Sequence, residues 1–310
     1  MKITRLIEGV VPVLQTPFRE DRSVDTAAIT RHIAFLAGTG IGGYWVLGTG
    51  SEDMNLTFAK RLAVARAATE ANAGKLPLVL GAGFFCMEDS LAFMKETAGL
   101  EFDAYHVMPY HPLLSLDRLD WYYRRLADAA TKPLWLYTSA NWARPITPAF
   151  VAKLKDHPNI TGIKYSTSNA PDQLKVIGLA EPGFQVMTAV VRQFFACLSM
   201  GAKSGTTSTA GALPEPIVDI FRRFAAGNLD EALALQRHFV RFLDALPNTS
   251  KADNFLTGAE EKYILKRRGI CELFMTDYYR DLNSDEQRQV DRALEQFQML
   301  PYVPLQFSNV

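Results

Sequence analysis

The chain has 310 residues, of which 48% are hydrophobic, so it can bury one barrel-sized core or two ordinary ones. Lys and Arg number 33, as do Asp and Glu, and this balance argues against nucleic acid and anionic membrane surfaces as partners. We expect neither a signal peptide nor a membrane-spanning helix, because no uninterrupted apolar run reaches about 18 residues. Cys86, Cys197 and Cys271 are widely spaced, which indicates reduced thiols in a soluble, cytoplasmic protein.

Short apolar, β-branched runs alternate with amphipathic segments along most of the chain. The predicted strands are Val10–Leu14, Gly43–Leu47, Leu76–Leu80, Ala104–Met108, Leu134–Tyr137, Ile160–Ile163, Gln185–Met187 and Ser204–Thr207. The predicted helices between and after them are Thr26–Ala37, Phe58–Asn72, Met87–Ala98, Leu116–Ala130, Pro148–Asp156, Pro171–Ala180, Val191–Met200 and Pro214–Ala226. Strand–helix units of this length are typical of parallel strands with right-handed crossovers.

Eight such units favour a closed (β/α)8 TIM barrel. A doubly wound open sheet is the alternative, but it usually has a Gly-rich loop after its first strand, where this chain has Gln15-Thr16-Pro17-Phe18. After Gly227 the alternation stops, and three further helices are predicted at Asp230–Ala245, Asp253–Gly269 and Ser284–Gln298. We therefore predict a catalytic barrel over residues 1–226 and a C-terminal helical region over residues 227–310 that packs on it.

Chemistry in this fold lies on the loops that follow the strands. The second predicted strand leads into Gly48-Thr49-Gly50-Ser51-Glu52, whose amides and hydroxyls could bind a carboxylate or form an ordinary capped turn. The fourth leads into Pro109-Tyr110-His111-Pro112, where the prolines could fix a phenol and an imidazole. His111 is either a proton carrier or a structural loop residue. We expect His106 to pack in the barrel interior, and no metal site beside it.

Lys164 directly follows the sixth predicted strand. Such a lysine often reaches from a strand end to solvent, but partial desolvation would favour the neutral amine, which attacks carbonyls. Tyr137 ends the fifth predicted strand, next to the position of Lys164. Its hydroxyl could relay protons during carbinolamine formation and bond cleavage, or it could belong to an ordinary core tyrosine.

Five motifs occur in an order and spacing that resemble one family: Thr16-Pro17-Phe18, Gly48-Thr49-Gly50-Ser51-Glu52, Pro109-Tyr110, Leu136-Tyr137 and Gly162-Ile163-Lys164. This combination resembles the dihydrodipicolinate synthase / N-acetylneuraminate lyase family of class I aldolases, from about Gly9 to the C-terminal helices. The resemblance implies a (β/α)8 barrel that usually assembles as a homotetramer.

By the same resemblance, Lys164 would form a Schiff base with pyruvate or another 2-oxo acid, and Tyr137 would move protons at the keto carbon. Tyr110 and His111 are the further catalytic candidates. Thr49, with the backbone N–H groups of Gly50 and Ser51, would hold the carboxylate. No metal or organic cofactor is needed, because the protonated imine is itself the electron sink.

Three departures from the family pattern concern the catalytic loops. Gly50 and Ser51 stand where the family usually has Thr and Gly. Thr138-Ser139-Ala140 replaces the usual Asn-x-Pro after the catalytic tyrosine. His111 replaces a second tyrosine that, in the synthase, is thought to reach a neighbouring subunit's proton relay.

Other departures concern the second substrate. Trp142 occupies the position of an arginine that binds aspartate semialdehyde in the synthase, and Arg144 is a candidate replacement. Ala189-Val190-Val191 contains no acid where the family has an acidic run. An apolar distal pocket with Trp142 and Val190 would suit a less polar acceptor or a short 2-oxo acid better than a sugar acid. Thr207 and Ser208 are further candidates for contact with the second substrate, although Ser208 could instead cap a helix.

The sequence thus predicts a Schiff-base-forming lyase that condenses pyruvate with an aldehyde, runs the reverse cleavage, or dehydrates a 2-oxo acid. We expect it to be neither the lysine-pathway synthase nor the sialic acid lyase. The alternatives are a non-catalytic sensor that binds 2-oxo acids, dihydrodipicolinate synthase proper, and a phosphate-handling barrel enzyme without an imine.

Overall fold

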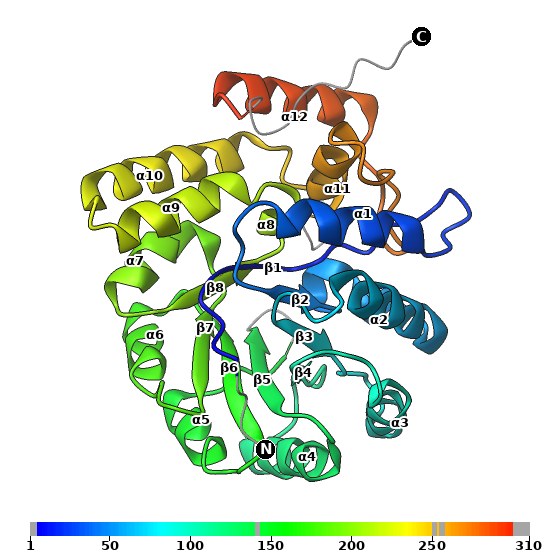
Figure 1. Cartoon of the computed structure of the whole chain (residues 1–310), viewed down its shortest axis with the longest axis vertical. Helices are drawn as coiled ribbons and strands as arrows, with labels where there is room; N and C mark the ends of the chain where they lie inside the picture. The colour runs from blue at the N-terminus through cyan, green and yellow to red at the C-terminus, as the bar shows by residue number, and fades with distance from the viewer. Residues whose placement is uncertain (1–4, 140–142, 250–252, 254–257, 300–310) are drawn as a thin grey trace. The chain divides into compact units, whose positions relative to one another are not determined.

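The structure is a computed structural model of the chain and describes residues 5–139, 143–249, 253 and 258–299. Its eight parallel strands form a nearly closed barrel in the order β1-β8-β7-β6-β5-β4-β3-β2 (Figure 1). The strands are β1 (Gly9–Pro12), β2 (Tyr44–Val46), β3 (Leu78–Gly81), β4 (Ala104–Val107), β5 (Leu134–Ser139), β6 (Ile160–Ser166), β7 (Gln185–Thr188) and β8 (Ser204–Thr207). Backbone hydrogen bonds link β1 to the residues that precede β2 and β8. Gly42 N donates to Val10 O at 2.8 Å, and Gly9 N donates to Lys203 O at 2.9 Å. The predicted (β/α)8 TIM barrel is confirmed.

Helices connect the strands and continue after the last one. They are α1 (Thr26–Ala37), α2 (Phe58–Asn72), α3 (Met87–Thr97), α4 (Leu116–Ala129), α5 (Pro148–Leu154), α6 (Ala170–Ile177), α7 (Phe194–Ser199), α8 (Thr209–Ala212), α9 (Glu215–Ala225), α10 (Leu229–Ala245), α11 (Gly258–Arg267) and α12 (Ser284–Gln296). Asp25, Ser115 and Thr147 begin α1, α4 and α5, because each side chain accepts a bond from the backbone N–H three residues later. After β8 the chain contains α9, α10, α11 and α12, so the C-terminal helical extension predicted from the sequence is present.

The structure changes some element boundaries. The predicted strand Ile160–Ile163 was too short, since β6 continues through Lys164 to Ser166 and pairs with β5 along that length. Lys164 therefore lies inside a strand and not just after one. The predicted helix Val191–Met200 is divided into the 3-10 turn η3 (Val191–Gln193) and α7. The predicted helix Asp253–Gly269 includes residues outside the described part, and within it the structure places α11 at Gly258–Arg267.

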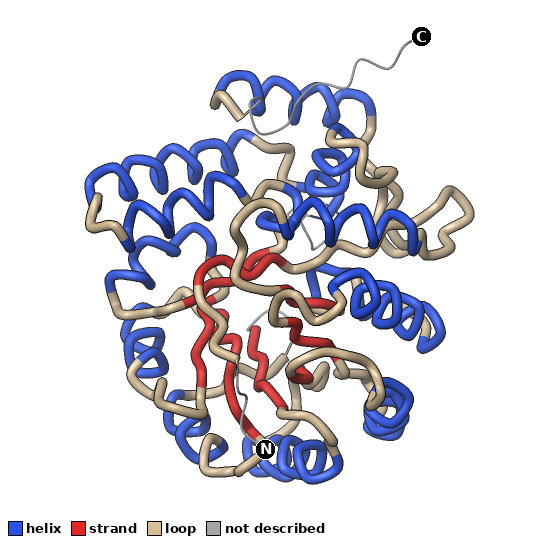
Figure 2. The backbone as a smooth tube through the Cα atoms, in the orientation of Figure 1, coloured by secondary structure: helices blue, strands red, loops and turns tan. Residues whose placement is uncertain are grey.

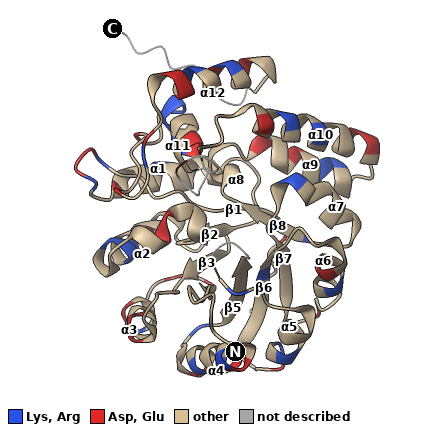
Figure 3. Cartoon of the chain, turned by 180° about the vertical axis from the view of Figure 1, so that it is seen from behind, with Lys and Arg blue, Asp and Glu red and all other residues tan. Residues whose placement is uncertain are grey.

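The chain divides into two compact units, which are described separately. The first comprises residues 1–11, 42–45 and 73–206, and within it the strands β3–β7 alternate with α3–α6 (Figure 2). The second comprises residues 12–41, 46–72 and 207–310 and contains α1, α2 and α8–α12. Acidic and basic residues are interspersed along α9, α10 and α12 of this second unit (Figure 3). The division between residues 226 and 227 follows from the end of the strand–helix alternation and stays a prediction.

No helix in the described part of the chain is both long and apolar enough to cross a membrane.

Candidate active site

Neighbouring strands of the first unit place Lys164 and Tyr137 side by side. Tyr137 on β5 is paired in register with Lys164 on β6, so both side chains extend from the same face of the sheet. The Lys164 side chain is buried, with the residue 4% exposed, and its Nζ lies 4.1 Å from the centre of the Tyr137 ring and 5.0 Å from that of Trp45. The structure therefore brings together the amine and the phenol that the sequence singled out.

Aromatic rings pack around this pair. Trp45 on β2 stacks on His106 with ring centres 4.1 Å apart, and meets Tyr137 edge-on at 5.8 Å. Gly162 leaves room for Trp135, since a Cβ at Gly162 would lie 2.4 Å from the Trp135 ring. His106 packs in the barrel interior as expected, and Trp45 and Trp135 are supporting residues that the sequence did not reveal. These rings hold the Lys164 and Tyr137 side chains in defined positions.

Helix α4 holds the backbone of Tyr137 in place. The hydroxyl of Tyr123 donates to Tyr137 O at 3.2 Å and to Val107 O at 3.4 Å. Complete burial raises the pKa of Tyr123 well above its ordinary value, so its hydroxyl keeps the proton that these carbonyls accept. Tyr123 is a positioning residue that sequence analysis missed, because its target is a backbone carbonyl on another element.

The loop after β4 contains Tyr110 and His111. Tyr110 is buried, whereas His111 is partly exposed and its Nε2 lies 2.7 Å from Phe85 O. Because a carbonyl only accepts, Nε2 must carry the proton in this contact. The rings of His111 and Phe85 are also 4.2 Å apart. These contacts hold the His111 ring against Phe85, and its role as a proton carrier stays a prediction. Arg144 donates to Leu114 O of the same loop at 3.0 Å.

The turn after β2, in the second unit, has a tightly determined backbone. Thr49–Ser51 form the 3-10 turn η1, and the non-glycine residues Leu47 and Glu52 on either side adopt left-handed φ values of 58° and 60°. The Ser51 hydroxyl donates to Leu14 O at 2.5 Å, and the Ser51 amide donates to Gly48 O at 2.8 Å. Ser51 thus uses its hydroxyl and its N–H to fix the turn itself.

The glycine at position 50 has a packing reason. A Cβ at Gly50 would lie 2.6 Å from Ser208 Cβ and 3.3 Å from Val13 Cγ1. Ser208 immediately precedes α8, yet its hydroxyl makes no capping bond and donates to Glu261 Oε1 at 2.8 Å. The Ser208 side chain therefore does not cap α8, and its contact with the second substrate stays a prediction. The neighbouring Thr207 Oγ1 accepts from Thr209 N at 3.3 Å.

Trp142 and Val190 are the predicted contacts of the apolar distal pocket. Trp142 lies outside the described residues. Val190 directly precedes η3 and is half-buried, together with Ala189 and Val191. Within the described residues, no group of three or more His, Cys, Asp or Glu side chains could hold a metal ion.

Comparisons with known proteins identify the family. Residues 6–296 match the dihydrodipicolinate synthetase family. The 4-hydroxy-tetrahydrodipicolinate synthase of Methanosphaerula palustris is 26% identical over 245 residues, which are 78% of this chain and 84% of that protein. An uncharacterized DapA-like lyase of Pyrococcus furiosus is 30% identical over 239 residues, 76% of this chain and 80% of that protein.

A solved structure shares the fold. YagE, a prophage protein of E. coli K12 solved in complex with pyruvate, has a TM-score of 0.87 at 22% identity, covering 95% of this chain and 99% of YagE. Members of the matching family are lyases that use no cofactor beyond the Schiff base formed by a lysine. The chain belongs to the dihydrodipicolinate synthetase family.

Proposed function

We propose that the protein is a lyase that forms a Schiff base between Lys164 and a 2-oxo acid of the pyruvate type. The observation that carries this proposal is the buried Lys164 amine, which lies against Tyr137 on the adjacent strand. The amine attacks the keto carbon to give a carbinolamine, which loses water to give the protonated imine. Tyr137 carries the protons that these steps move.

The second half of the reaction starts from the imine. The imine withdraws electrons from its neighbouring carbon, so loss of a proton or cleavage of a C–C bond there gives an enamine. Addition of the enamine to an aldehyde is the reverse of the cleavage. Thr49 and the Gly50 amide would bind the carboxylate, while Ser51 keeps the turn in shape through Leu14.

We propose a substrate that is short, or weakly polar in the part that lies away from the keto carbon. Ala189, Val190 and Val191 contain no acid that could bind sugar hydroxyls, and leaving such hydroxyls unpaired in an apolar site is unfavourable. Pyruvate is the simplest 2-oxo acid of this class, and an aldehyde is its condensation partner. By family resemblance we also propose a homotetramer that works in the cytoplasm.

The experiment measures both trapping and turnover. The protein is incubated with pyruvate and borohydride, and 2-oxo acids with and without aldehydes are tested for turnover. We expect a reduced adduct, its loss in Lys164→Arg, and turnover of at least one substrate. Adduct formation without any turnover would favour the sensor, and the absence of an adduct would exclude the imine.

Dihydrodipicolinate synthase proper is the second candidate, because the relative from Methanosphaerula palustris is named a 4-hydroxy-tetrahydrodipicolinate synthase. Condensation of pyruvate with aspartate semialdehyde separates the two candidates. We expect this activity to be weak or absent, since the sequence lacks the synthase arginine at the Trp142 position. Robust condensation would contradict our choice.

A further inference from the structure

Helix α11 of the second unit carries three consecutive charged residues in a buried segment. Residues 258–265 are all buried, and Glu260, Glu261 and Lys262 are 1%, 2% and 1% exposed. A helix that is buried all round is normally apolar, because a buried charge is costly unless it is paired. The partners of these three side chains therefore show what the helix holds in place.

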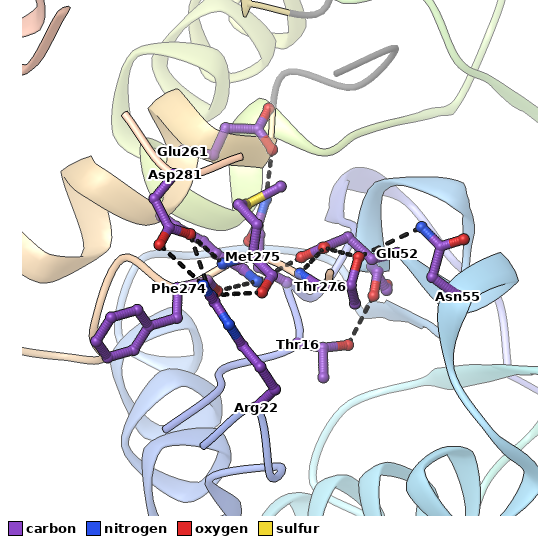
Figure 4. Close-up of polar contacts among 12 residues, drawn as sticks. Thr16, Arg22, Glu52, Asn55, Glu261, Phe274, Met275, Thr276 and Asp281 are labelled. Carbon is purple, nitrogen blue, oxygen red and sulfur yellow. Dashed lines mark hydrogen bonds and ion pairs between the residues drawn. The ribbon is translucent and has the colours of Figure 1, made fainter. Parts of the chain in front are cut away.

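Lys262 holds the residue that ends the turn after β2. Its amine forms an ion pair with Glu52 and donates to Phe274 O at 2.7 Å. The other Glu52 oxygen accepts from the backbone N–H and from the hydroxyl of Thr276, each at 2.8 Å (Figure 4). Glu52 is thus bound on both carboxylate oxygens, which fixes a residue whose φ of 60° is unfavourable for a non-glycine residue.

The segment that binds Glu52 is itself anchored from the other side. Arg22 donates to Met275 O at 2.7 Å and pairs with Asp281, which in turn accepts from Met275 N at 2.6 Å (Figure 4). Residues 274–276 are therefore held both by Arg22 with Asp281 and by the Glu52–Lys262 pair. This arrangement gives Glu52 a rigid partner.

Glu261 acts on the same turn through Ser208. Its carboxylate accepts from the hydroxyls of Ser208 and Thr209, at 2.8 and 3.1 Å, and from Gln15 Nε2 at 2.8 Å. Ser208 in turn packs against Gly50, in the middle of the turn. Glu260 makes a different contact, since it accepts from the backbone N–H and hydroxyl of Thr249, at 2.6 and 2.8 Å.

We propose that Lys262 and Glu261 are positioning residues that give the Gly48–Ser51 turn the shape needed to bind the substrate carboxylate. Lys262 acts through Glu52 and Glu261 acts through Ser208. Backbone strain of the kind seen at Glu52 persists only where the surroundings determine it, and the ion pair with Lys262 supplies that constraint. The inference rests on the proposed function, in which this turn holds the carboxylate.

The test removes the constraint without leaving a buried charge unpaired. Lys262→Met alone would strand the Glu52 carboxylate, so the Glu52→Gln/Lys262→Met double variant replaces both charges together. We measure the pyruvate concentration that gives half-maximal borohydride trapping, and the trapping rate at saturating pyruvate. We expect the half-maximal concentration to rise about tenfold, as for loss of one charge-assisted hydrogen bond, while the saturated rate changes by less than about twofold.

Glu260→Gln is the matched control, because it alters an equally buried carboxylate on the same helix. We expect it to lower the melting temperature and to leave the half-maximal pyruvate concentration unchanged. Glu261→Gln and Thr276→Val are the milder variants if the double variant does not fold, and each should raise that concentration by about threefold or more.

Four outcomes separate the possibilities. A folded double variant with the half-maximal concentration of the unmodified protein would overturn the inference, as would an equal rise in Glu260→Gln. If the double variant is unfolded, unchanged values in both milder variants would overturn it. If the unmodified protein gives no adduct, the proposed function fails and the inference falls with it.

Discussion

At the scale of single residues, the candidate site depends on glycines at positions where a neighbouring side chain leaves no room for a Cβ atom. Gly162 lies against Trp135 and Gly50 lies against Ser208, each too close to admit a methyl group. The sequence pointed to Lys164 and Tyr137, since a strand ending in a polar group is visible in a local pattern. It could not show Trp45 beside Lys164, because that contact joins residues more than a hundred positions apart.

Gly50→Ala tests the packing of the turn against Ser208. The added methyl group would lie 2.6 Å from Ser208 Cβ, so we expect the free energy of unfolding to fall by about 1–3 kcal/mol. Urea unfolding measures the change. Because Ser208→Gly removes the obstructing side chain, the double variant should recover part of the loss; a loss that is simply additive would show that Ser208 is not the obstacle.

At the scale of secondary-structure elements, β6 and α11 show two features that the sequence did not predict: where a strand ends and which charged residues of a helix are buried. The apolar run of β6 was recognised, but its continuation through Lys164 to Ser166 was not, because a lysine and a serine do not look like a strand interior. Three consecutive charged residues, Glu260, Glu261 and Lys262, would by themselves indicate an exposed stretch of helix. Their burial follows from partners such as Glu52 and Ser208, which come from distant parts of the sequence.

Gly162→Ala tests whether β6 needs a glycine beside Trp135. A Cβ there would lie 2.4 Å from the indole, so we expect a loss of about 1–3 kcal/mol in unfolding free energy together with slower trapping by Lys164. Gly99→Ala is the control, because nothing lies within 4 Å of its added Cβ. Equal stability of the two variants would contradict the packing argument.

Helix α1 makes the stability depend on pH through His32. This side chain is fully buried, its Nε2 lies 2.7 Å from Gly211 O, and burial lowers its pKa to about 4. Between that value and the ordinary value of about 6.5, the unfolded chain binds the extra proton, so stability is lost as the pH falls.

We expect His32 to account for a loss of about 2 kcal/mol in unfolding free energy between about pH 7 and about pH 5. Urea unfolding at several pH values checks this. The decline should be smaller in His32→Gln, which keeps a donor for Gly211 O but does not titrate. An equally steep decline in that variant would assign the pH dependence to other groups.

At the scale of the whole molecule, the barrel could be predicted because each strand–helix repeat has its own local signals: a short apolar run, a polar turn and an amphipathic helix. Polar side chains such as Asp25, Ser115 and Thr147 also mark where helices begin. The short α8 was not predicted, since four residues, Thr209–Ala212, are too few to show a helical period. The substrate cannot be read in the same way, because it depends on loop side chains and not on the alternation that defines the barrel.

The central claim is that Lys164 forms the imine, and peptide mapping after borohydride reduction with pyruvate tests it most directly. Lys262 is the internal control, because it is also a buried lysine and forms an ion pair with Glu52. We predict that the added mass of the reduced adduct lies on the peptide containing Lys164 and that the peptide containing Lys262 is unmodified. An adduct on Lys262, or no adduct on either peptide, would contradict the account.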